Sequence, residues 1–529
     1  MDGLVDLSTG IVADKSSNAH LAYEIGLKAA HSITGMTFSD VKLKRADGVI
    51  SIKAARDKIN VRGQEVEYNC ELLFARVSSV STPQEMQENL KYEFARAAPS
   101  LFEKGLMRKN DKSVLGHLLR DGYALDVQAP TPGEQHVVDG GKFVQTVPWP
   151  PTSENYEDVL NEYIRYACNN YSPHSHFVMD GYKDENSVKI AEQKRRIKGN
   201  VARDIIFKSD TKLSKFTKSE FLNNILNKGR FVKLLSQKLR QNGYEVTECK
   251  RDADIEIAQA ALSQSKHGPI CLDANDTDIL VMVVHAGSVS ADLIMKLPSG
   301  RYRITDIKQG LKPNAVKYAL VAHGMSGNDT VSALFRRGKC IAFKVIDKGT
   351  VNDLSYLDTF LSKTSSHDEV AFAGEKFLLA MYNSPKKVKT LDDLRFEFYK
   401  KRIKKTLTSK TGVELRSLPP TSDSAKYHSY RAYYQIQLWL GNKQIDPTDW
   451  GWVRNGYLVP IVKDREAAPD KVLRLISCGC KQGCSVGSAS KKSKCSCVNA
   501  GLKCTILCSG CNGRDCDNCD HFIESEETV

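Results

Sequence analysis

The sequence predicts an α/β fold built on a mainly parallel sheet with helices on both faces. Short apolar runs alternate with segments of helical periodicity between about residues 131 and 350, as in parallel strands joined by crossover helices. Aspartates stand at or just past the ends of several of these runs, where such sheets gather their functional groups. Helical extensions and a small cysteine-rich module at the C-terminal end complete the expected architecture.

The alternation begins with the strand QHVVDGG, which reaches Asp139, and with a helix over residues 155–171 whose apolar positions recur at helical spacing. A second strand, HFVMDGY, leads to Asp180. An amphipathic helix over residues 230–243 ends at a glycine, which commonly terminates helices. The run YEVTEC is the third expected strand.

The second half of the α/β region continues the same pattern. Asp252 and Asp254 open a helical pattern in RDADIEIAQAA, and the strand GPICLDA leads to Asp276 and Asp278. The segment LIMKLPSGRYRITDI predicts a hairpin that turns at residues 298–300. The last aspartate of interest, Asp329, lies in GMSGNDTVSALF.

The length of 529 residues predicts several domains, because one core of ordinary size does not serve so long a chain. The net charge of +13 weakly favours a polyanionic partner, but a soluble basic surface is the simpler explanation and charge alone does not decide. We expect a mixed region of unknown role over residues 1–130, the α/β domain over 131–350, a mostly helical region over 351–475 and a cysteine-rich domain over 476–520.

The expected compartment follows from two further features. No apolar run approaches the roughly 20 residues that span a bilayer, so we expect no membrane partner. The N-terminal sequence MDGLVDLSTG has neither the basic nor the apolar region of a signal peptide. We therefore expect a protein that is not secreted and works in a reducing compartment, either the nucleus or the cytoplasm.

Seven aspartates are candidate metal ligands. Converging carboxylates repel one another and resist desolvation, so a fold that gathers them commonly supplies cations. Oxygen-only ligands suit hard ions such as Mg²⁺ or Mn²⁺. Each aspartate has an alternative explanation as a helix N-cap or turn residue, but their order along the chain favours the metal site. The candidates are Asp139, Asp180, Asp252, Asp254, Asp276, Asp278 and Asp329.

This order resembles the PIN-like superfamily and, within it, the flap endonucleases. The matching features are an aspartate that ends a strand, a VMDG turn, an acidic pair that opens a helix, a D-x-D pair after a strand and a G-x-D turn, over about residues 135–350. The resemblance implies a nuclease in which two divalent ions about 4 Å apart clamp the scissile phosphate. It assigns one ion to Asp139, Asp180, Asp252 and Asp254, and the other to Asp276, Asp278 and Asp329.

Flap endonucleases also hold the substrate phosphate with basic residues on a helix after the second aspartate. By this resemblance Lys194 and Arg195 take that role, although a solvated helix face explains them equally well. The glycine-rich turn with which those enzymes grip duplex is represented by Gly338, and this weakens the expectation of a duplex contact. The combination with a cysteine-rich tail is also similar to a set of eukaryotic, transposon-associated proteins.

Ten of the fifteen cysteines lie between residues 478 and 519. In a reducing compartment this clustering indicates zinc and not disulfides. The spacing Cys-x-Cys-x6-Cys-x3-Cys resembles the tesmin-type CXC domain, which implies shared zinc ligands and DNA binding, although the insert SVGSASKKSK departs from that pattern. The expected ligands are Cys478, Cys480, Cys484, Cys495, Cys497, Cys504, Cys508, Cys511, Cys516 and Cys519.

Taken with these resemblances, the residues predict a metal-dependent nuclease that hydrolyses nucleic-acid phosphodiesters, with DNA favoured over RNA, and a zinc module that binds DNA. One alternative is a catalytically inactive nucleic-acid or chromatin-binding protein that keeps a nuclease-like fold. The presence of all seven aspartates favours the enzyme, because an inactive relative is expected to lose some of them. A zinc-stabilised interaction protein without a nucleic-acid role is a third possibility, against which the basic charge argues mildly.

Overall fold

Two units make up the fold of the chain. The computed structural model describes residues 21–36, 49, 57–61, 64–68, 70–121, 126–127, 129–181, 201–250, 253–287, 289–290, 292–347, 354–406, 413–473, 480, 484, 495–499, 504, 508, 511 and 516–518. The first unit comprises Met1–Leu106, Tyr382–Ala425 and Val462–Val529, and the second comprises Met107–Met381 and Lys426–Ile461. The division into four functional domains stays a prediction.

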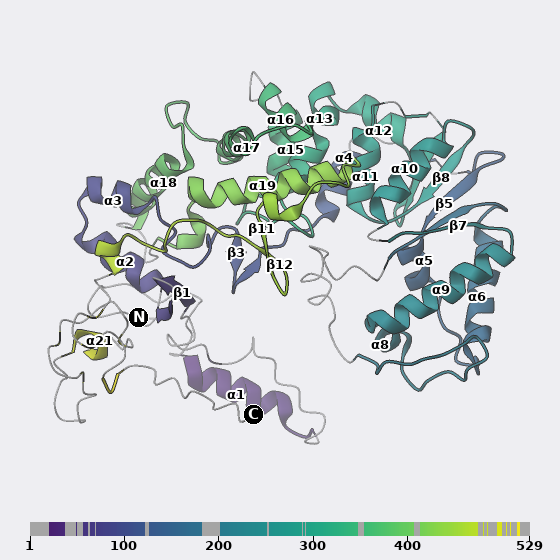
Figure 1. Ribbon diagram of the computed structural model, residues 1–529, viewed down its shortest axis with the longest axis horizontal. Helices are drawn as coiled ribbons and strands as arrows, with labels where there is room; N and C mark the ends of the chain where they lie inside the picture. Colours follow the sequence, from purple (N-terminus) through teal and green to yellow (C-terminus); the bar gives the residue numbers. More distant parts are fainter. Residues whose placement is uncertain are drawn as a thin grey trace. The chain divides into compact units, whose positions relative to one another are not determined.

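A six-stranded sheet forms the centre of the second unit (Figure 1). The strand order is β10-β9-β8-β5-β6-β7, and every neighbouring pair is parallel except β9 and β10, which form the expected hairpin. The predicted mainly parallel sheet is therefore confirmed. Its strands are β5 (Gln135–Asp139), β6 (His176–Met179), β7 (Glu245–Glu248), β8 (Ile270–Asp273), β9 (Leu293–Leu297) and β10 (Gly300–Arg303).

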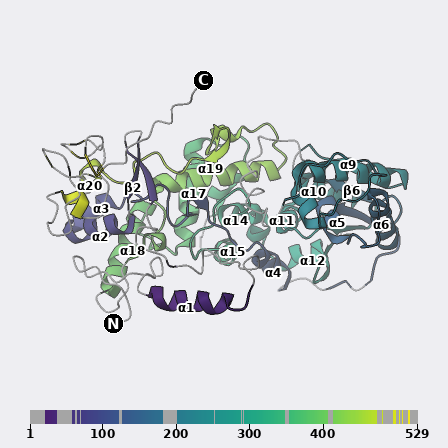
Figure 2. The ribbon, with the colours of Figure 1, turned by 90° about the horizontal axis from the view of Figure 1, so that it is seen from below.

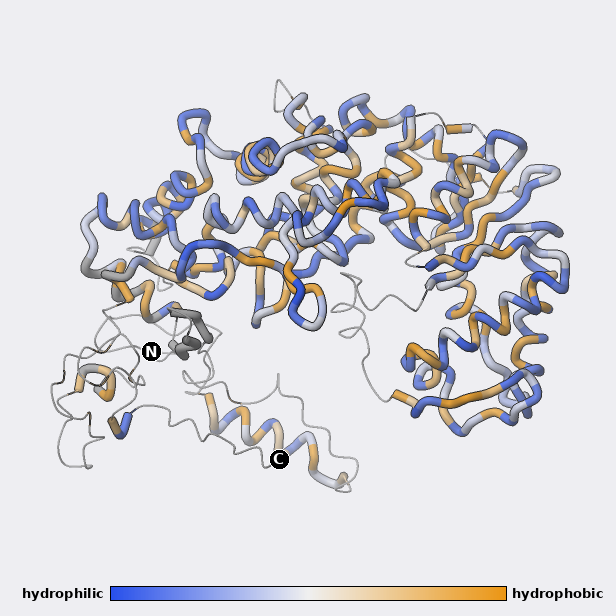
Figure 3. Tube along the Cα trace, viewed as in Figure 1, coloured by the Kyte–Doolittle hydropathy of each residue, from blue (hydrophilic) through white to orange (hydrophobic). Residues whose placement is uncertain are grey.

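Helices cover both faces of this sheet, as predicted. Successive side chains of a strand point to opposite faces of the sheet. Val138 therefore packs in the core on one face, and the neighbouring Val137 is buried on the other. The lower face in Figure 1 carries α5 (Gly140–Thr146), α6 (Tyr156–Asn170) and α9 (Ile225–Gln241), and the other carries α10 (Asp254–Gln264), which contacts β5 and β8. Figure 3 shows that the central strands are mostly hydrophobic, as burial on both faces requires.

Aromatic side chains dominate the core beneath the sheet. Phe143, Tyr163, Phe177 and Phe231 are all fully buried. Their rings form a chain of tilted or edge-to-face pairs, Phe177–Phe143, Phe143–Tyr163 and Tyr163–Phe231, with centroids 4.9–5.4 Å apart. Burying a side chain of this size stabilises the fold by about 1.5–3 kcal/mol. This core fixes the lower helices against β5 and β6, and it thereby holds the carboxyl ends of those two strands in place.

A helical layer adjoins the carboxyl edge of the sheet. Figure 2 shows α4, α11, α14 and α15 grouped together, and these helices contact one another in pairs. Among the described helices, none is both long and apolar enough to span a membrane. The remaining elements of this unit are α4 (Ser113–Asp121), α8 (Lys218–Asn223), α11 (Thr277–His285), α12 (Ile304–Gly310), α13 (Pro313–Lys317), α14 (Ala319–Met325), α15 (Lys339–Asp347), α16 (Asp358–Leu361), α17 (His367–Met381), α19 (Ser422–Trp439) from residue 426 onwards, β11 (Trp452–Asn455) and β12 (Tyr457–Pro460).

The first unit has a smaller core around Phe74, Phe94 and Tyr399. Arg395 beside this core is fully buried, donates to the carbonyl of Leu90 at 2.9 Å and lies 3.2 Å from a carboxylate oxygen of Glu93. The elements here are α1 (Ala22–Ile33), β1 (Asp57–Val61), β2 (Gln64–Tyr68), α2 (Cys70–Val80), α3 (Pro83–Asn89), β3 (Phe102–Glu103), β4 (Leu106–Met107, at the unit's edge), α18 (Leu391–Thr406), α20 (Asp470–Leu473) and α21 (Ser496–Asn499).

Candidate functional site

Two predicted aspartates lie at the carboxyl ends of neighbouring parallel strands. Asp139 is the last residue of β5 and caps α5, where its Oδ1 accepts a hydrogen bond from the backbone N–H of Lys142 at 3.1 Å. Asp180 directly follows β6, and its Oδ1 accepts from the N–H of Ala253 at 3.2 Å. Because β5 and β6 pair in parallel, both carboxylates reach the same edge of the sheet.

Gly141 shows how close these two carboxylates are. A Cβ atom at this position would lie 3.1 Å from Oδ2 of Asp180 and 3.2 Å from Oδ1 of Asp139. The glycine therefore leaves a small open space between two acidic groups. Burial raises the pKa of Asp139 to about 6, and the negative charges of Asp180 and Asp276 act in the same direction. A cation in this space would relieve the cost of holding both carboxylates ionised.

A second group of carboxylates stands at the start of two helices. Asp254 is the first residue of α10, and Asp276 caps α11, where it accepts a hydrogen bond from the N–H of Asp278 at 2.8 Å. One carboxylate oxygen from each of the three lies within 4.8 Å of the others. The positive ends of the two helix dipoles favour negative charge here. The helices thus offset part of the repulsion within the group.

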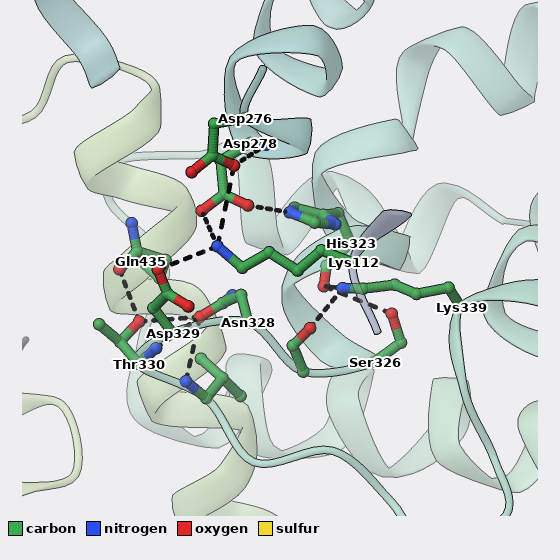
Figure 4. A network of polar contacts seen from close by, with 12 residues as sticks. Lys112, Asp276, Asp278, His323, Ser326, Asn328, Asp329, Thr330, Lys339 and Gln435 are labelled. Atoms are coloured by element: carbon green, nitrogen blue, oxygen red, sulfur yellow. Dashed lines mark hydrogen bonds and ion pairs between the residues drawn. The ribbon is translucent and has the colours of Figure 1, made fainter. Parts of the chain in front are cut away.

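The ammonium of Lys112 lies among three predicted ligands (Figure 4). Its Nζ is 3.0 Å from Oδ2 of Asp278, 3.0 Å from Oδ2 of Asp329 and 3.8 Å from Oδ1 of Asp276. Burial acts to lower the pKa of Lys112, but the three carboxylates outweigh it and raise the pKa above its ordinary value. Lys112 is therefore charged at neutral pH and fills the centre of this carboxylate set.

A buried polar network supports Asp278 from behind. Nε2 of His323 lies 2.7 Å from Oδ1 of Asp278, and the imidazole stacks on the ring of Trp439 at 5.2 Å between centroids. The Nζ of Lys339, fully buried, donates to the carbonyls of His323, at 2.7 Å, and of Gly327. Burial lowers the pKa of Lys339 to about 7. The network fixes the orientation of the Asp278 carboxylate.

An open cleft of about 470 Å³ adjoins the aspartates. Lys142 stands at its wall and forms an ion pair with Asp273, the last residue of β8. Asp273 also accepts a hydrogen bond from the hydroxyl of Tyr171 at 3.0 Å. The cleft is large enough for a phosphodiester group next to the carboxylates. It is lined by Asp139, Gly141, Lys142, Gln145, Thr146, Asn275 and Asp276.

The structure brings together the six predicted aspartates that it describes. Asp139 and Asp180 lie close together at Gly141, and Asp254, Asp276, Asp278 and Asp329 form the adjoining set. Asp252, Lys194 and Arg195 lie outside the described residues.

Two residues of the site were missed by sequence reasoning. Lys112 lies in the N-terminal region of unknown role, 166 residues from its partner Asp278. His323 is a lone histidine in an apolar helix. Neither belongs to a motif, so only their tertiary positions reveal them.

The C-terminal cysteines that the structure describes form one cluster, in which Cys480 is half-buried and the others are buried. Their sulfurs lie 3.7–3.9 Å apart in the pairs Cys484–Cys511, Cys495–Cys504 and Cys497–Cys508, and all the described cysteines are free thiols. A disulfide requires about 2.05 Å, whereas sulfurs about 2.3 Å from one tetrahedral ion lie roughly 3.8 Å apart. Sulfurs that fall within 4.8 Å of one another form three sets: Cys484, Cys504, Cys511 and Cys516; Cys480, Cys484 and Cys495; Cys495, Cys497 and Cys504.

Three cysteines of this cluster, Cys484, Cys495 and Cys504, each belong to two of the sets. Thiolates placed in this way are able to bridge neighbouring ions. Two expected ligands, Cys478 and Cys519, lie outside the described residues.

Comparison with known proteins gives a partial family match. A family model described as "Domain of unknown function (DUF8702)" matches residues 1–93. No curated protein matches the chain. The family match covers a minor part of the chain, and that part does not include the aspartates.

Solved structures similar to this chain include proteins determined with DNA or with metal ions. One is the catalytic core of Rad2 in complex with DNA substrate, with 14% identity, a TM-score of 0.31 and coverage of 66% of this chain and 89% of that chain. Another is the bacteriophage T5 D15 protein co-crystallised with metal ions, with 10% identity, a TM-score of 0.29 and coverage of 52% and 99%. TM-scores near 0.3 do not establish a shared function, so the chemistry of the site has to decide it.

Proposed function

We propose that the second unit is a PIN-like, metal-dependent nuclease that hydrolyses nucleic-acid phosphodiesters with two divalent cations, Mg²⁺ or Mn²⁺. The observation that carries this proposal is the convergence of six aspartates at the carboxyl edge of a parallel sheet, beside an open cleft. The same residues occur along the chain in the order that flap endonucleases use. If these aspartates served only as helix caps and turn residues, nothing would require six carboxylates to lie in one place.

The donor set fits two hard cations. Asp139 and Asp180 flank the space at Gly141. Asp276, Asp278 and Asp329 surround a second position, which the ammonium of Lys112 occupies. All these donors are carboxylate oxygens, which favour Mg²⁺ or Mn²⁺ over softer ions. When bound, such ions would activate water and stabilise the leaving oxygen.

The chain's own residues prepare this chemistry in three ways. The core beneath β5 and β6 fixes the backbone of Asp139 and Asp180. His323 holds one oxygen of Asp278, so that the other is directed to the front of the site. The cleft beside Asp139 and Asp276 admits the substrate. Lys194 and Arg195 are the proposed contacts to its phosphate, by the family resemblance.

The cysteine cluster is proposed to bind zinc and to anchor the protein on DNA. The spacing of the described sulfurs supports zinc, because it suits tetrahedral coordination. Three of these cysteines also belong to two sulfur sets each, as ligands shared between neighbouring zinc ions would. Cys478 and Cys519 complete the proposed ligand set. The proposed work on DNA favours the nucleus over the cytoplasm, the other compartment that the sequence allows.

The test is cleavage of labelled flap, duplex and single-stranded nucleic acids by the full-length protein with Mg²⁺, Mn²⁺ or EDTA. We expect cleavage with either ion and none with EDTA. Asp278→Asn should remove it, while the control Asp292→Asn, at an exposed position outside the site, should cut at the wild-type rate. Equal cleavage by wild type and Asp278→Asn would overturn the proposal.

One observation favours a second candidate function, a nucleic-acid-binding protein without turnover. Lys112 already neutralises part of the negative charge on Asp276, Asp278 and Asp329, which is what a divalent ion would otherwise do. In that case the protein would bind nucleic acid equally well with and without divalent ions, and no ion-dependent cleavage would be seen on any substrate.

A further inference from the structure

Lys112 is held firmly at the centre of its carboxylate set. The residue precedes α4, and its neighbour Asp111 fixes the local turn by accepting hydrogen bonds from the N–H of Ser113 at 2.9 Å and from its hydroxyl at 2.6 Å. Helix α4 in turn contacts α11, which carries Asp278, and α15. The side chain of Lys112 is only 19% exposed. This is a built position and not a surface lysine that happens to meet an acid.

The position of the ammonium excludes a divalent ion bound by the same oxygens. Mg²⁺ holds carboxylate oxygens at about 2.0–2.1 Å, so an ion shared by Asp278 and Asp329 would lie in the space that Nζ takes at 3.0 Å from each. Two positive groups in one such space would also repel each other strongly, because Lys112, Asp278 and Asp329 are largely buried and screening is weak there. The ammonium and the ion are therefore alternatives.

We propose that Lys112 is an internal gate for the second metal position, which takes a divalent ion at Asp276, Asp278 and Asp329 only when the lysine side chain moves out. This inference rests on the proposed function and deepens it. The ion that binds at this second position has to displace the ammonium of Lys112. The second ion consequently binds more weakly than its three carboxylates alone would allow.

Calorimetric titration with Mn²⁺ tests the gate on the full-length protein. The variants are Lys112→Met, which keeps the length of the side chain but not its charge, and Lys296→Met, a control that removes a half-exposed charge from the same unit. We expect the wild type and Lys296→Met to bind one ion at least tenfold more tightly than the second. In Lys112→Met the second ion should bind at least tenfold more tightly than it does in the wild type.

The possible results separate the gate from the function on which it rests. Equal affinity for the second ion in Lys112→Met and the wild type, with two ions bound in each, would overturn the gate and leave the proposed metal site standing. No binding of Mn²⁺ by any of the three proteins would overturn the metal site and the gate together.

A measurement on the wild type makes the test independent of how the variant folds. The rate at which an amine-acylating reagent modifies Lys112 is followed by mass spectrometry of peptides, with the exposed Lys233 as internal reference. Saturating Mn²⁺ should raise the rate at Lys112 relative to Lys233 by at least fivefold, because the displaced ammonium reaches solvent. An unchanged ratio with both ions bound would contradict the gate.

Discussion

Nε2 of His323 lies 2.7 Å from Oδ1 of Asp278, and both side chains are buried. Burial, together with the nearby charge of Lys339, lowers the pKa of His323 to about 4 despite the attraction of Asp278. The imidazole is thus neutral near pH 7, and its Nε2–H donates to the carboxylate. This contact sets which oxygen of Asp278 faces Lys112 and the front of the site.

We predict that His323→Leu weakens Mn²⁺ binding and slows single-turnover cleavage by about 10- to 100-fold, the usual effect of losing a group that orients a metal ligand. His323→Gln should recover part of the loss, since its amide N–H is able to donate to Asp278. Thermal unfolding of each variant separates this effect from a loss of fold. Wild-type metal affinity in His323→Leu would exclude a positioning role.

Gly141→Ala should impair the site from the opposite side. The added Cβ would meet the carboxylate oxygens of Asp180 and Asp139 at 3.1 and 3.2 Å, so both have to shift. We expect at least a tenfold loss of Mn²⁺ affinity with little change in melting temperature. Gly268→Ala is the matched control, because a Cβ there meets nothing within 4 Å. If both variants bind Mn²⁺ alike, the space at Gly141 is not part of the site.

The sequence predicted the scaffold of this site well, because burial on both sheet faces and amphipathic helices leave strong periodic signals. The predicted apolar face of α6 is buried, and the glycine at 243 ends the last turn of α9 with a positive φ of 86°. Most of the aspartates lie at strand ends or helix starts, which are local features, so their positions were predicted without knowledge of tertiary structure. Their role as metal ligands stays a prediction.

What escaped prediction depends on contacts between distant segments. Lys112 reaches the aspartates only because α4 packs against α11. Nothing in the sequence DKSVLGHLLR predicts that contact. His323 becomes a partner of Asp278 only through the packing of α14 against α11. Single charged or polar residues of this kind have no periodic signature, so a single sequence does not distinguish them from solvated or core positions.

We predict a pH dependence of folding stability that arises from His428. Its Nε2 lies 2.9 Å from the carbonyl of Met325, and burial, with the charge of Arg431, lowers its pKa to about 4. An unfolded chain binds a proton near pH 6.5, so between pH 6.5 and 4 the unfolded state holds more protons than the native state. The contribution of the neutral His428 to the free energy of unfolding is therefore fully present above pH 6.5. It declines as the pH falls, by up to about 3 kcal/mol near pH 4.

Urea denaturation at several pH values between 4 and 7.5 measures this slope. His428→Asn should be less stable than the wild type at pH 7 but should lose less stability on acidification. The control His267→Asn, at an exposed position, should keep the wild-type slope. A slope that is the same in His428→Asn and the wild type would assign the acid sensitivity to other groups.

The cysteine cluster predicts unequal effects of single substitutions. Cys504 belongs to two of the sulfur sets, whereas Cys516 belongs to one. If these sulfurs hold zinc, native mass spectrometry should show that Cys504→Ser loses more metal than Cys516→Ser. Cys168→Ser, at an exposed position outside the cluster, should keep the full zinc content. Equal loss in the two cluster variants would mean that Cys504 does not bridge, and a wild type without zinc would remove the metal altogether.

Removal of residues 476–529 should separate binding from chemistry. The deleted segment carries the cysteine cluster and several lysines, and the proposed catalytic carboxylates all lie in the second unit. Contacts of lysine and arginine with phosphates release counterions, so their loss weakens binding and flattens its dependence on salt. We therefore expect weaker DNA binding, a shallower salt slope in gel shifts, and unchanged single-turnover cleavage at saturating nucleic acid. An unchanged salt slope would take the cysteine module off the DNA-binding surface, and lost single-turnover cleavage would mean that it helps to build the active site.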